Sequence, residues 1–591
     1  MADRFVRGKK VGADLRAARG PLGDWSLAAL PRPIPRTSLR HVVRVMFAMT
    51  LAAGATAVRA TEPATFDIVV YGGTSGGIAA AVESARRGHS VVLIEPGRRL
   101  GGMTTNGLGA TDMWEKDKVG GFAREFYAAI YAHYERPDAW RYETRDEYRP
   151  KHRDALAEDL RLQFFFEPSV ALRILEQRLQ SAGVTVWRGE RLLRPGGAQK
   201  RNNRLTAIEL ESGRRVAGCV FIDASYEGDL LAEAGVSYVT GREARREFDE
   251  RLAGITYLPL ARTAHLDPFR ARGEAGSGLL PGVEPTPPGA EGEGDHRAQA
   301  YTFRVCLTDV PENRVEIARP ANYDPLRYEL LARHLEKYPQ QTIGPRLFKL
   351  TPMPNRKTDS NNQGLLSTDF VGASHAWAEA SYAERERLWQ AHRDYVQGFF
   401  WFLQNDERVP AAVREQARRW GLAKDEFVET DNWPSQLYVR EARRMRGDYV
   451  VTEHDCTGRR IADDPVALGA YALDSHQVTY FIDAEKRLRG EGAFWFEVPP
   501  YGISRRALQP REAECANLLV PVCVSATHVA YGSLRMEPVF MMLGQASALL
   551  ASLAIEQDTS VQCVRYEALR PLLEEAGLPL SAPKAEMRPT P

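Results

Sequence analysis

The sequence predicts an α/β fold in which a parallel sheet and its crossover helices begin near residue 66. The first observation is FDIVVY at residues 66–71, a β-branched apolar run typical of a buried parallel strand. The second is a glycine-rich turn directly after this run, followed by IAAAVESAR, which strongly favours a helix. We expect this helix to end at Gly88. The third is HSVVLIE, a second apolar strand that ends at Glu95. Strand, turn, helix and strand in this order predict a βαβ unit.

The turn GGTSGG at residues 72–77 has the spacing of a dinucleotide-binding fingerprint, with one departure. Gly72 occupies the first position and Gly77 the third, and we expect the helix to begin just after Gly77. The second glycine normally lets the backbone approach a pyrophosphate, but this chain has Thr74 there. Glu95, eighteen residues after Gly77, is placed to accept hydrogen bonds from ribose hydroxyls. The predicted nucleotide site comprises Gly72, Gly73, Thr74, Ser75, Gly76, Gly77, Glu95 and Pro96; the alternative is an α/β unit that only resembles one.

A second glycine pair favours FAD over NAD as the nucleotide. LGGMTTNGLGATD at residues 100–112 comes soon after Glu95, and Gly101, Gly102 and Met103 let the chain pass close to a bound cofactor. The sequence has no second glycine fingerprint, so we expect no separate nicotinamide domain. We therefore predict a tightly held FAD that is reduced by a small-molecule substrate.

The 591 residues carry a net charge of +1, which is unevenly distributed. Residues 1–60 contain eleven Lys/Arg and three Asp/Glu, a net of +8, which leaves −7 on the remainder. A mildly acidic body argues against nucleic acid as a partner.

The basic N-terminal region contains a candidate export signal. RHVVRVMFAMTLAAGATAVRA at residues 40–60 combines basic residues, a short apolar run and small residues, which predicts a secretory signal cleaved after Ala60. The apolar run is too short to favour a membrane span. We expect an exported protein, periplasmic or extracellular, without stable membrane insertion after cleavage; the alternative is an uncleaved anchor.

The six cysteines show no CxxC or metal-ligand spacing, so no metal site is predicted. In an exported protein some of them are candidates for disulfides, and the alternative is that all are free. HExxH and Walker motifs are absent from the sequence.

Longer segments carry a family resemblance. Besides the two glycine segments they are FEPSVALRIL (166–175), VFIDASYEGDLLAEAGVSYVTGREA (220–244), KTDSNNQGLLSTDFVG (357–372), LYVREARRMRGDYV (437–450) and ECANLLVPVCVSATHVAYGSLRMEPVFMMLGQASALLAS (514–552). Over residues 66–575 the chain resembles the FAD-dependent oxidoreductases related to fumarate reductase flavoproteins. Within them it is similar to an exported bacterial group labelled xanthan lyase-like. Related sequences often carry Thr at the second fingerprint position, as this chain does with Thr74.

The resemblance implies further contacts with FAD. The strand VFIDAS ends at Asp223 and Ala224, which lead into the next turn of the cofactor domain, and Arg188 is expected near the adenine. The C-terminal helix that begins with SLRMEP is expected to point its N-terminus at the flavin pyrimidine. That end of the helix comprises Ser533, Leu534, Arg535 and Met536.

These segments predict a Rossmann-like FAD-binding domain, discontinuous and closed by the C-terminal helix, with an inserted α+β substrate or cap domain. We assign residues 61–244 and 506–575 to the FAD-binding domain and residues 245–505 to the cap. Residues 1–60 are assigned to the N-terminal extension and signal, and residues 576–591 to a tail.

Five residues are candidates for chemistry. His528 is the preferred base, since it lies between the closing strand and the C-terminal helix, and His476 in the cap is the second candidate. Arg535 and Arg440 are cationic candidates for holding an anionic substrate. Tyr501 comes after a Pro-Pro pair and is expected to line the same cleft. The alternative for each histidine is a structural or surface role.

Together these features predict an FAD-dependent oxidoreductase that transfers a hydride from a small organic substrate to flavin N5. The family label suggests a carbohydrate-derived substrate, and the electrons leave to an unknown acceptor. Two alternatives remain open. One is a lyase or hydrolase with a structural FAD or without net redox chemistry, and the other is a flavin-binding protein without turnover.

Overall fold

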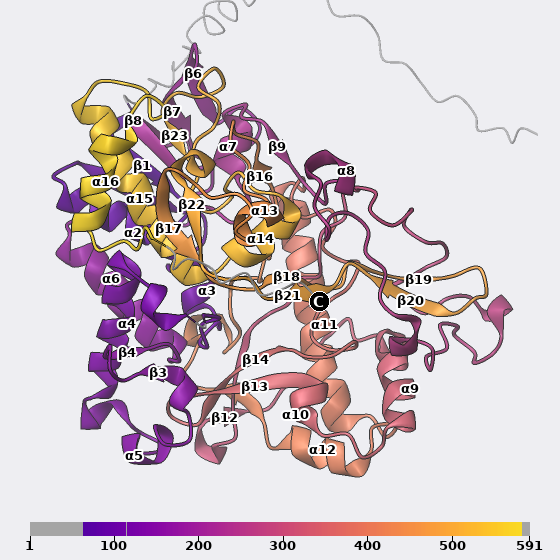
Figure 1. The fold of residues 1–591 in the computed structure, drawn as a ribbon. Helices are drawn as coiled ribbons and strands as arrows, with labels where there is room; N and C mark the ends of the chain where they lie inside the picture. The colour runs from indigo at the N-terminus through magenta and orange to yellow at the C-terminus, as the bar shows by residue number, and fades with distance from the viewer. Residues whose placement is uncertain (1–62, 114, 582–591) are drawn as a thin grey trace, which may run out of the picture. The chain divides into compact units, whose positions relative to one another are not determined.

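A seven-stranded sheet forms the core of the part that is predicted to bind the cofactor in the computed structural model, which describes residues 63–113 and 115–581 (Figure 1). Its strands, in spatial order, are β5 (Thr185–Arg188), β2 (Val91–Glu95), β1 (Ala64–Tyr71), β8 (Arg215–Asp223), β7 (Arg204–Glu209) and β6 (Ala198–Arg201), with β23 (Leu518–Leu519) also paired to β8. The pairs among β5, β2, β1, β8 and β23 are parallel, whereas β7 and β6 form an antiparallel edge. The predicted βαβ unit and Rossmann-like sheet are confirmed.

The helix that connects β1 to β2 begins inside the glycine turn. This helix, α2 (Ser75–Arg86), starts at Ser75, so the expected start after Gly77 is wrong. Thr74 is its N-cap residue, and its side-chain oxygen accepts a hydrogen bond from the Gly77 amide at 3.2 Å. A capping threonine stabilises a helix start even when glycines occupy the first turn.

The C-terminal helix is interrupted where one continuous helix was predicted. α14 (His528–Leu534) ends before α15 (Glu537–Glu556) begins, with Arg535 and Met536 between them. The reason is Pro538, which has no amide hydrogen to donate to the Leu534 carbonyl. The break leaves Arg535 and Met536 at the N-terminal end of α15.

Helix α15 packs against α2 at close range, although the two come from opposite ends of the described chain (Figure 1). A Cβ atom on Gly544 would lie 2.0 Å from the Gly76 carbonyl oxygen, and one on Gly76 would lie 2.8 Å from the Phe540 carbonyl oxygen. Glycine at both positions is therefore required for this crossing. Among the described residues, α15 is the one helix long and apolar enough to cross a membrane, but 94% of its apolar window is buried inside the protein.

The remaining chain contributes a second, antiparallel sheet and its helices. The sheet has the order β12 (Arg314–Val315), β15 (Gly421–Ala423), β11 (Val305–Thr308), β14 (Lys357–Asn362) and β13 (Phe348–Met353). Beside it lie α9 (Glu329–Lys337), α10 (Ile343–Arg346), α11 (Tyr382–Asn405) and α12 (Ala411–Arg418) (Figure 1). Mixed helices and antiparallel strands agree with the α+β character expected of this region.

Shorter elements complete the fold. The strand pairs are β3 (Leu156–Ala157) with β4 (Leu162–Gln163), β9 (Tyr238–Val239) with β16 (Arg444–Met445), β17 (Pro465–Gly469) with β22 (Tyr501–Ser504), and β18 (Leu473–Ser475) with β21 (Phe494–Phe496). A three-stranded sheet joins β10 (Val283–Glu284), β19 (Thr479–Ile482) and β20 (Leu488–Glu491). The other helices are α3 (Gly102–Thr105), α4 (Gly121–Tyr134), α5 (Arg145–Tyr148), α6 (Pro168–Ser181), α7 (Asp229–Glu233), α8 (Arg245–Phe248), α13 (Glu453–Cys456) and α16 (Tyr566–Glu575).

The two ends of the chain bear on three of the predictions. The export signal lies outside the described residues, and the boundaries between the two predicted domains stay predictions, because the described chain falls in one unit. The predicted tail, residues 576–591, stays a prediction, although its first residues contact the fold. The Gly121 amide donates to the Gly577 carbonyl at 3.0 Å and Leu578 is buried, so the chain stays packed past residue 576.

All six cysteines are free.

A buried ion cluster ties the antiparallel sheet to the cofactor-binding part. The Lys357 ammonium on β14 lies 2.7 Å from Glu167, 2.8 Å from Glu426 and 3.0 Å from Asp425, and its side chain is 1% exposed. Glu167 is the N-cap residue of α6. Burial disfavours the charged ammonium, but the surrounding carboxylates outweigh it and raise the pKa of Lys357 well above its usual value. The cluster therefore depends on the lysine charge.

Replacing Lys357 by Met leaves three carboxylates close together without a cation. We expect Lys357→Met to lower the free energy of unfolding by about 3–5 kcal/mol, the usual cost of breaking a buried ion pair, and to lower the melting temperature accordingly. Lys424→Met, at an exposed position nearby in the sequence, is the matched control and should melt with the wild type. Equal melting temperatures for the two variants would show that the cluster contributes no stability.

Candidate active site

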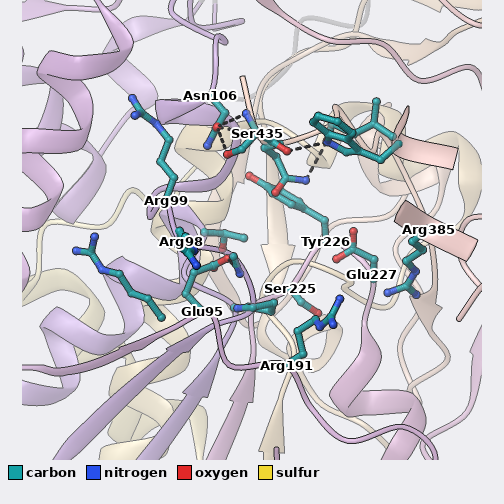
Figure 2. Close-up of a pocket in the computed structure, with 18 of the residues that line it drawn as sticks. Glu95, Arg98, Arg99, Asn106, Arg191, Ser225, Tyr226, Glu227, Arg385 and Ser435 are labelled. Atoms are coloured by element: carbon teal, nitrogen blue, oxygen red, sulfur yellow. Dashed lines mark hydrogen bonds between the residues drawn. The ribbon is translucent and has the colours of Figure 1, made fainter. Parts of the chain in front are cut away.

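A cavity of about 620 Å³, here called the first cavity, opens at the carboxyl ends of the parallel strands (Figure 2). Ligands of doubly wound sheets bind at this edge. The segments directly after β1, β2, β5 and β8 all reach it. Its lining includes Gly72, Thr74, Glu95, Pro96, Gly97, Arg98, Arg99, Asn106, Arg188, Arg191, Ser225, Tyr226, Glu227, Trp377, Tyr382, Arg385, Trp389, Ser435, Gln436 and Leu437.

The first and third fingerprint positions admit only glycine. Gly72 has a φ of +99°, and a Cβ there would lie 2.5 Å from the Ser225 amide nitrogen. A Cβ on Gly77 would lie 1.9 Å from the Gly72 carbonyl oxygen. These contacts bring β1, α2 and the end of β8 together, which is the role of the two glycines in a dinucleotide turn.

Thr74 lines the first cavity, but its hydroxyl is turned to the protein. The hydroxyl donates to the Ala224 carbonyl at 2.8 Å and accepts from the Gly77 amide. Both bonds are internal to the turn and to the end of β8. The second fingerprint position therefore tolerates threonine because its hydroxyl is used as a cap and as a tie to β8.

Glu95 occupies the position expected of a ribose acceptor. Its carboxylate accepts from the Gly73 amide at 2.7 Å and from the Gly97 amide at 2.5 Å. Burial raises the pKa of Glu95 to about 7, although both amide bonds act in the opposite direction. The carboxyl group is thus held by the glycine turn and changes charge near neutral pH.

The second glycine segment packs against Tyr226 and Glu537. A Cβ on Gly102 would lie 2.3 Å from the Tyr226 hydroxyl, which accepts from the Met103 amide at 2.9 Å. Tyr226 also donates to Glu537 at 2.7 Å. Ser75 and Thr104 donate to the same carboxyl group at 2.6 and 2.7 Å. Glu537, the first residue of α15, therefore joins the glycine turn, α3 and the end of β8.

A further cavity of about 620 Å³, here called the second cavity, lies at the N-terminal end of α15. The walls of the two cavities contain consecutive residues of the chain: Leu437 lines the first cavity and Tyr438 lines the second. Its walls come from the antiparallel sheet, the β18–β21 pair and the break between α14 and α15. They include Asp112, Arg262, Arg304, Lys349, Asn361, Asn362, Gln363, Tyr438, Tyr471, Asp474, His476, Gln477, Trp495, Arg535 and Met536.

His476 and Arg535 come together in the second cavity. Nδ1 of His476 lies 2.6 Å from an oxygen of Asp369, and Nε2 lies 3.4 Å from an oxygen of Asp474. Arg535 donates to the same Asp474 carboxylate at 2.8 Å and to the Tyr438 hydroxyl at 2.9 Å. Burial pushes the pKa of Asp474 upward, but the ring of His476, when it is protonated, and the guanidinium of Arg535 lower that pKa to about 2. Asp474 is therefore an anion that links the histidine to the arginine.

Arg440 supports this group from behind. It donates to Asp369 at 2.9 Å and to the Ala300 carbonyl, and its side chain is fully buried. Burial raises the pKa of Asp369, but Arg440 and His476 outweigh it and hold that pKa below its usual range. Arg440 does not line either cavity, so its predicted contact with a substrate stays a prediction. It fixes Asp369, which in turn orients His476.

His528 and Tyr501, both expected in the cleft, lie in the protein interior. His528 is 1% exposed, and its Nδ1 lies 2.8 Å from Glu441, the residue after Arg440. Tyr501 is buried and donates to the Ser533 hydroxyl at 2.8 Å. Neither residue lines either cavity. Each side chain instead turns to an interior partner that its own segment does not reveal, and a catalytic role for either residue stays a prediction.

Some of the predicted cofactor residues line one of the two cavities, and the others lie behind the cavity walls. Gly72, Thr74, Glu95, Pro96 and Arg188 line the first cavity, while Arg535 and Met536 line the second. The rest support these walls from within, and Ser533 and Leu534 are buried in α14. This supporting group comprises Gly73, Ser75, Gly76, Gly77, Gly101, Gly102, Met103, Asp223, Ala224, Ser533 and Leu534.

Asp223 is one of these supporting residues. One of its oxygens accepts from the Ser225 hydroxyl at 2.7 Å and the other accepts from the Leu231 amide at 2.8 Å. Burial raises the pKa of Asp223 to about 6. Its carboxyl group therefore shapes the turn after β8 rather than facing the cavity.

Two sets illustrate why the sequence did not predict all the lining residues of the first cavity. Ser225, Tyr226 and Glu227 come directly after the predicted Asp223–Ala224 pair (Figure 2), and extending that motif would have found them. Trp377 and Trp389 had no such signal, because the fold of the cap alone brings them to the first cavity.

Comparison with known proteins identifies the family. Residues 67–573 match the family described as FAD dependent oxidoreductase, which covers most of the chain. The chain belongs to this family. Its cofactor is FAD. A search of curated proteins returned no match.

Similar solved structures are partial matches. A flavin monooxygenase from Stenotrophomonas maltophilia is 16% identical, with 32% of this chain and 44% of that chain covered and a TM-score of 0.19. L-proline dehydrogenase from P. horikoshii is 14% identical, with 33% and 60% covered and a TM-score of 0.21. The Diels-Alderase PyrE3 of pyrroindomycin biosynthesis is 13% identical, with 51% and 47% covered and a TM-score of 0.23. The chain thus spans less than two thirds of each, and these likenesses carry no information on its substrate.

The residues of the two cavities fit FAD. The N-terminus of α2, where the glycines leave no room for a Cβ, is suited to a pyrophosphate, and Glu95 to the ribose hydroxyls. Nη2 of Arg99 is buried at the first cavity without a hydrogen-bond partner, which leaves a donor for a phosphate or an adenine nitrogen. Arg535 and Met536 at the start of α15 are suited to the flavin end of the cofactor.

The pKa of Glu95 makes FAD affinity depend on pH. Above about pH 7 the carboxylate is ionised and accepts hydrogen bonds from ribose more strongly. We expect the affinity of the apoprotein for FAD, measured by fluorescence anisotropy, to rise by about 5–10-fold from pH 6 to pH 8, or roughly 1 kcal/mol. Glu95→Gln should abolish this rise, and the exposed control Glu485→Gln should retain it. A pH-independent affinity in the wild type would remove Glu95 from the ribose site.

Proposed function

We propose that the chain oxidises a hydroxyl-bearing carbon of a small polar substrate held in the second cavity. The observation that carries the proposal is the His476–Asp369 pair, which reaches a cavity whose other wall is Arg535 and Met536 at the start of α15. A histidine held by a carboxylate is suited to general base catalysis. It stands where the family's cofactor is expected to present its reactive end.

The proposed step conserves atoms and electrons. When bound, FAD supplies the acceptor for the hydride that leaves the substrate carbon, and this hydride carries two electrons. As the C–H bond breaks, the substrate hydroxyl loses its proton to Nε2 of His476 and a C=O bond forms. The imidazole accepts that proton on the nitrogen that Asp369 does not occupy. An external electron acceptor then completes the cycle.

The neighbouring side chains prepare His476 for this role. Asp369 accepts from Nδ1–H, which leaves Nε2 as the basic nitrogen and fixes the plane of the ring. Arg440 holds Asp369 from behind. Asp474 lies 3.4 Å from Nε2 and stabilises the imidazolium once the proton has transferred, while Arg535 fixes Asp474.

Sequence features support the finer parts of the proposal. The resemblance of the longer sequence segments to the exported group labelled xanthan lyase-like supports membership of that subgroup, and the name of that group suggests a substrate derived from carbohydrate. The segment RHVVRVMFAMTLAAGATAVRA supports export to the periplasm or the cell exterior. An exported oxidase or dehydrogenase of this kind needs an acceptor outside the cytoplasm, such as a quinone, a redox protein or dioxygen.

Single-turnover kinetics with paired histidine variants test the assignment of the base. With any compound that bleaches the wild-type flavin anaerobically, we expect His476→Gln to slow flavin reduction by about 10²–10⁴-fold. Its FAD content and melting temperature should stay at the wild-type level. The exposed control His296→Gln should reduce its flavin at the wild-type rate.

His528→Gln distinguishes the present assignment from the one that the sequence alone suggests. If His528→Gln loses its flavin reduction rate while His476→Gln keeps it, His476 is not the base. If substrate turns over without any flavin bleaching, the chain is a lyase or hydrolase and the proposal fails.

A further inference from the structure

The second cavity has buried nitrogen donors that no described residue satisfies. Nη1 of Arg304, Nε2 of Gln477 and Nε of Arg535 are buried, line or adjoin this cavity, and have no hydrogen-bond partner. Buried polar groups in native proteins are nearly always paired, so each of these atoms points to a missing partner. All three are donors, so the groups that satisfy them must present acceptor atoms. Arg535 is already suited to the flavin end of the cofactor, which leaves Arg304 and Gln477 for another ligand.

Arg304 is held in place by a buried carboxylate. Its Nε and Nη2 form a two-bond pair with Asp359, with Nε 2.7 Å from the carboxylate, and its side chain is 2% exposed. The fork geometry of the guanidinium then fixes the direction of the third nitrogen, Nη1. The nearest acid to Nη1 is Asp112, whose oxygen is 3.7 Å away, beyond hydrogen-bond distance. Nη1 is thus a positioned, unfilled donor.

Gln477 places a second donor on another wall. Its amide oxygen lies 3.1 Å from the Tyr480 hydroxyl, which also contacts the Leu365 carbonyl, and its Nε2 has no hydrogen-bond partner. Arg304 directly precedes β11, whereas Gln477 lies between β18 and β19. The two donors belong to separate elements that meet at one cavity.

The mouth of the cavity adds positive charge and a sugar-compatible surface. Arg262 and Lys349 are exposed, and no carboxylate of the described residues lies within 4.0 Å of either. Asn361 and Asn362 line the same cavity, and Trp495 on β21 is 48% exposed. Asp359 offsets much of the charge of Arg304, so the long-range attraction for an anion comes from the exposed pair.

We infer that the second cavity takes a hydroxylated carboxylic acid of the sugar-acid class, with its carboxylate on Arg304 Nη1 and Gln477 Nε2. That this ligand is also the substrate rests on the function proposed above. A carboxylate forms charge-assisted bonds to the guanidinium, while the hydroxyl groups suit the side-chain amides. The indole of Trp495 offers an apolar face for the C–H side of a sugar ring. A neutral sugar lacks the charge that Arg262 and Lys349 attract.

Matched ligand pairs test this inference on the FAD-loaded protein by isothermal titration. Glucuronate and glucose differ at one carbon, as do gluconate and sorbitol, and each pair exchanges a carboxylate for a CH₂OH group. We expect the acid of at least one pair to bind at least about 10-fold more tightly than its neutral partner. Arg304→Lys keeps a charge beside Asp359 but loses the directed Nη1, and it should abolish most of that preference.

Two further variants guard against a folding defect in Arg304→Lys, which is checked by melting temperature and FAD content. Gln477→Leu removes the second donor and should weaken acid binding several-fold while sparing neutral sugars. The double variant Arg262→Gln/Lys349→Gln should weaken acid binding and reduce its dependence on salt.

The outcomes separate the inference from the proposed function. Equal binding of acid and neutral partners, or a preference that survives both Arg304→Lys and Gln477→Leu, overturns the inference. Tight binding of succinate without any binding of the hydroxylated acids also overturns it. Selective acid binding without flavin bleaching supports the inference and contradicts the proposed oxidation. Flavin bleaching by neutral sugars alone, insensitive to Arg304→Lys, supports the oxidation and overturns the inference.

Discussion

The close crossing of α2 and α15 is the constraint on which the rest of the site depends. At Gly76 and Gly544 the two backbones approach so closely that a Cβ on either residue has no room. This approach sets the start of α15 against the glycine turn, where Ser75, Thr104 and Tyr226 all donate to Glu537. A segment near the C-terminus thereby completes a nucleotide site that begins at residue 72.

The same crossing places the chemistry. Because Pro538 interrupts the helix, Arg535 and Met536 stand at the N-terminal end of α15 and line the second cavity. Arg535 fixes Asp474, and Asp474 lies beside His476. The histidine of the cap is therefore connected to the cofactor-binding part by two ionic contacts. Displacing α15 by the width of one methyl group would therefore shift Arg535, and with it Asp474 and His476.

The sequence was sufficient where local geometry decides the outcome. The strand, turn and helix at residues 66–95 result from apolar runs and from glycines whose backbone positions exclude a Cβ. The threonine at the second fingerprint position also has a local explanation, since the Thr74 hydroxyl caps α2 and donates to the Ala224 carbonyl. The start of α2 was missed by a few residues because a cap bond was not considered.

Tertiary partners decided the remaining points. His528 sits where a flavin-facing base was expected, yet Glu441 on a distant segment holds its ring in the interior. His476 was the weaker candidate in sequence, and Asp369, more than a hundred residues away, makes it the one that faces a cavity. Neither contact has a signature in a single sequence, because each depends on how the cap folds back.

The absorption spectrum of the purified protein, recorded anaerobically before and after adding sugar acids, tests the central claim most directly. That claim is that the glycine turn with Thr74 holds FAD next to a cavity in which the substrate is oxidised. The account predicts flavin absorption bands that at least one hydroxylated acid bleaches. A protein that shows no flavin bands even after incubation with FAD would contradict it.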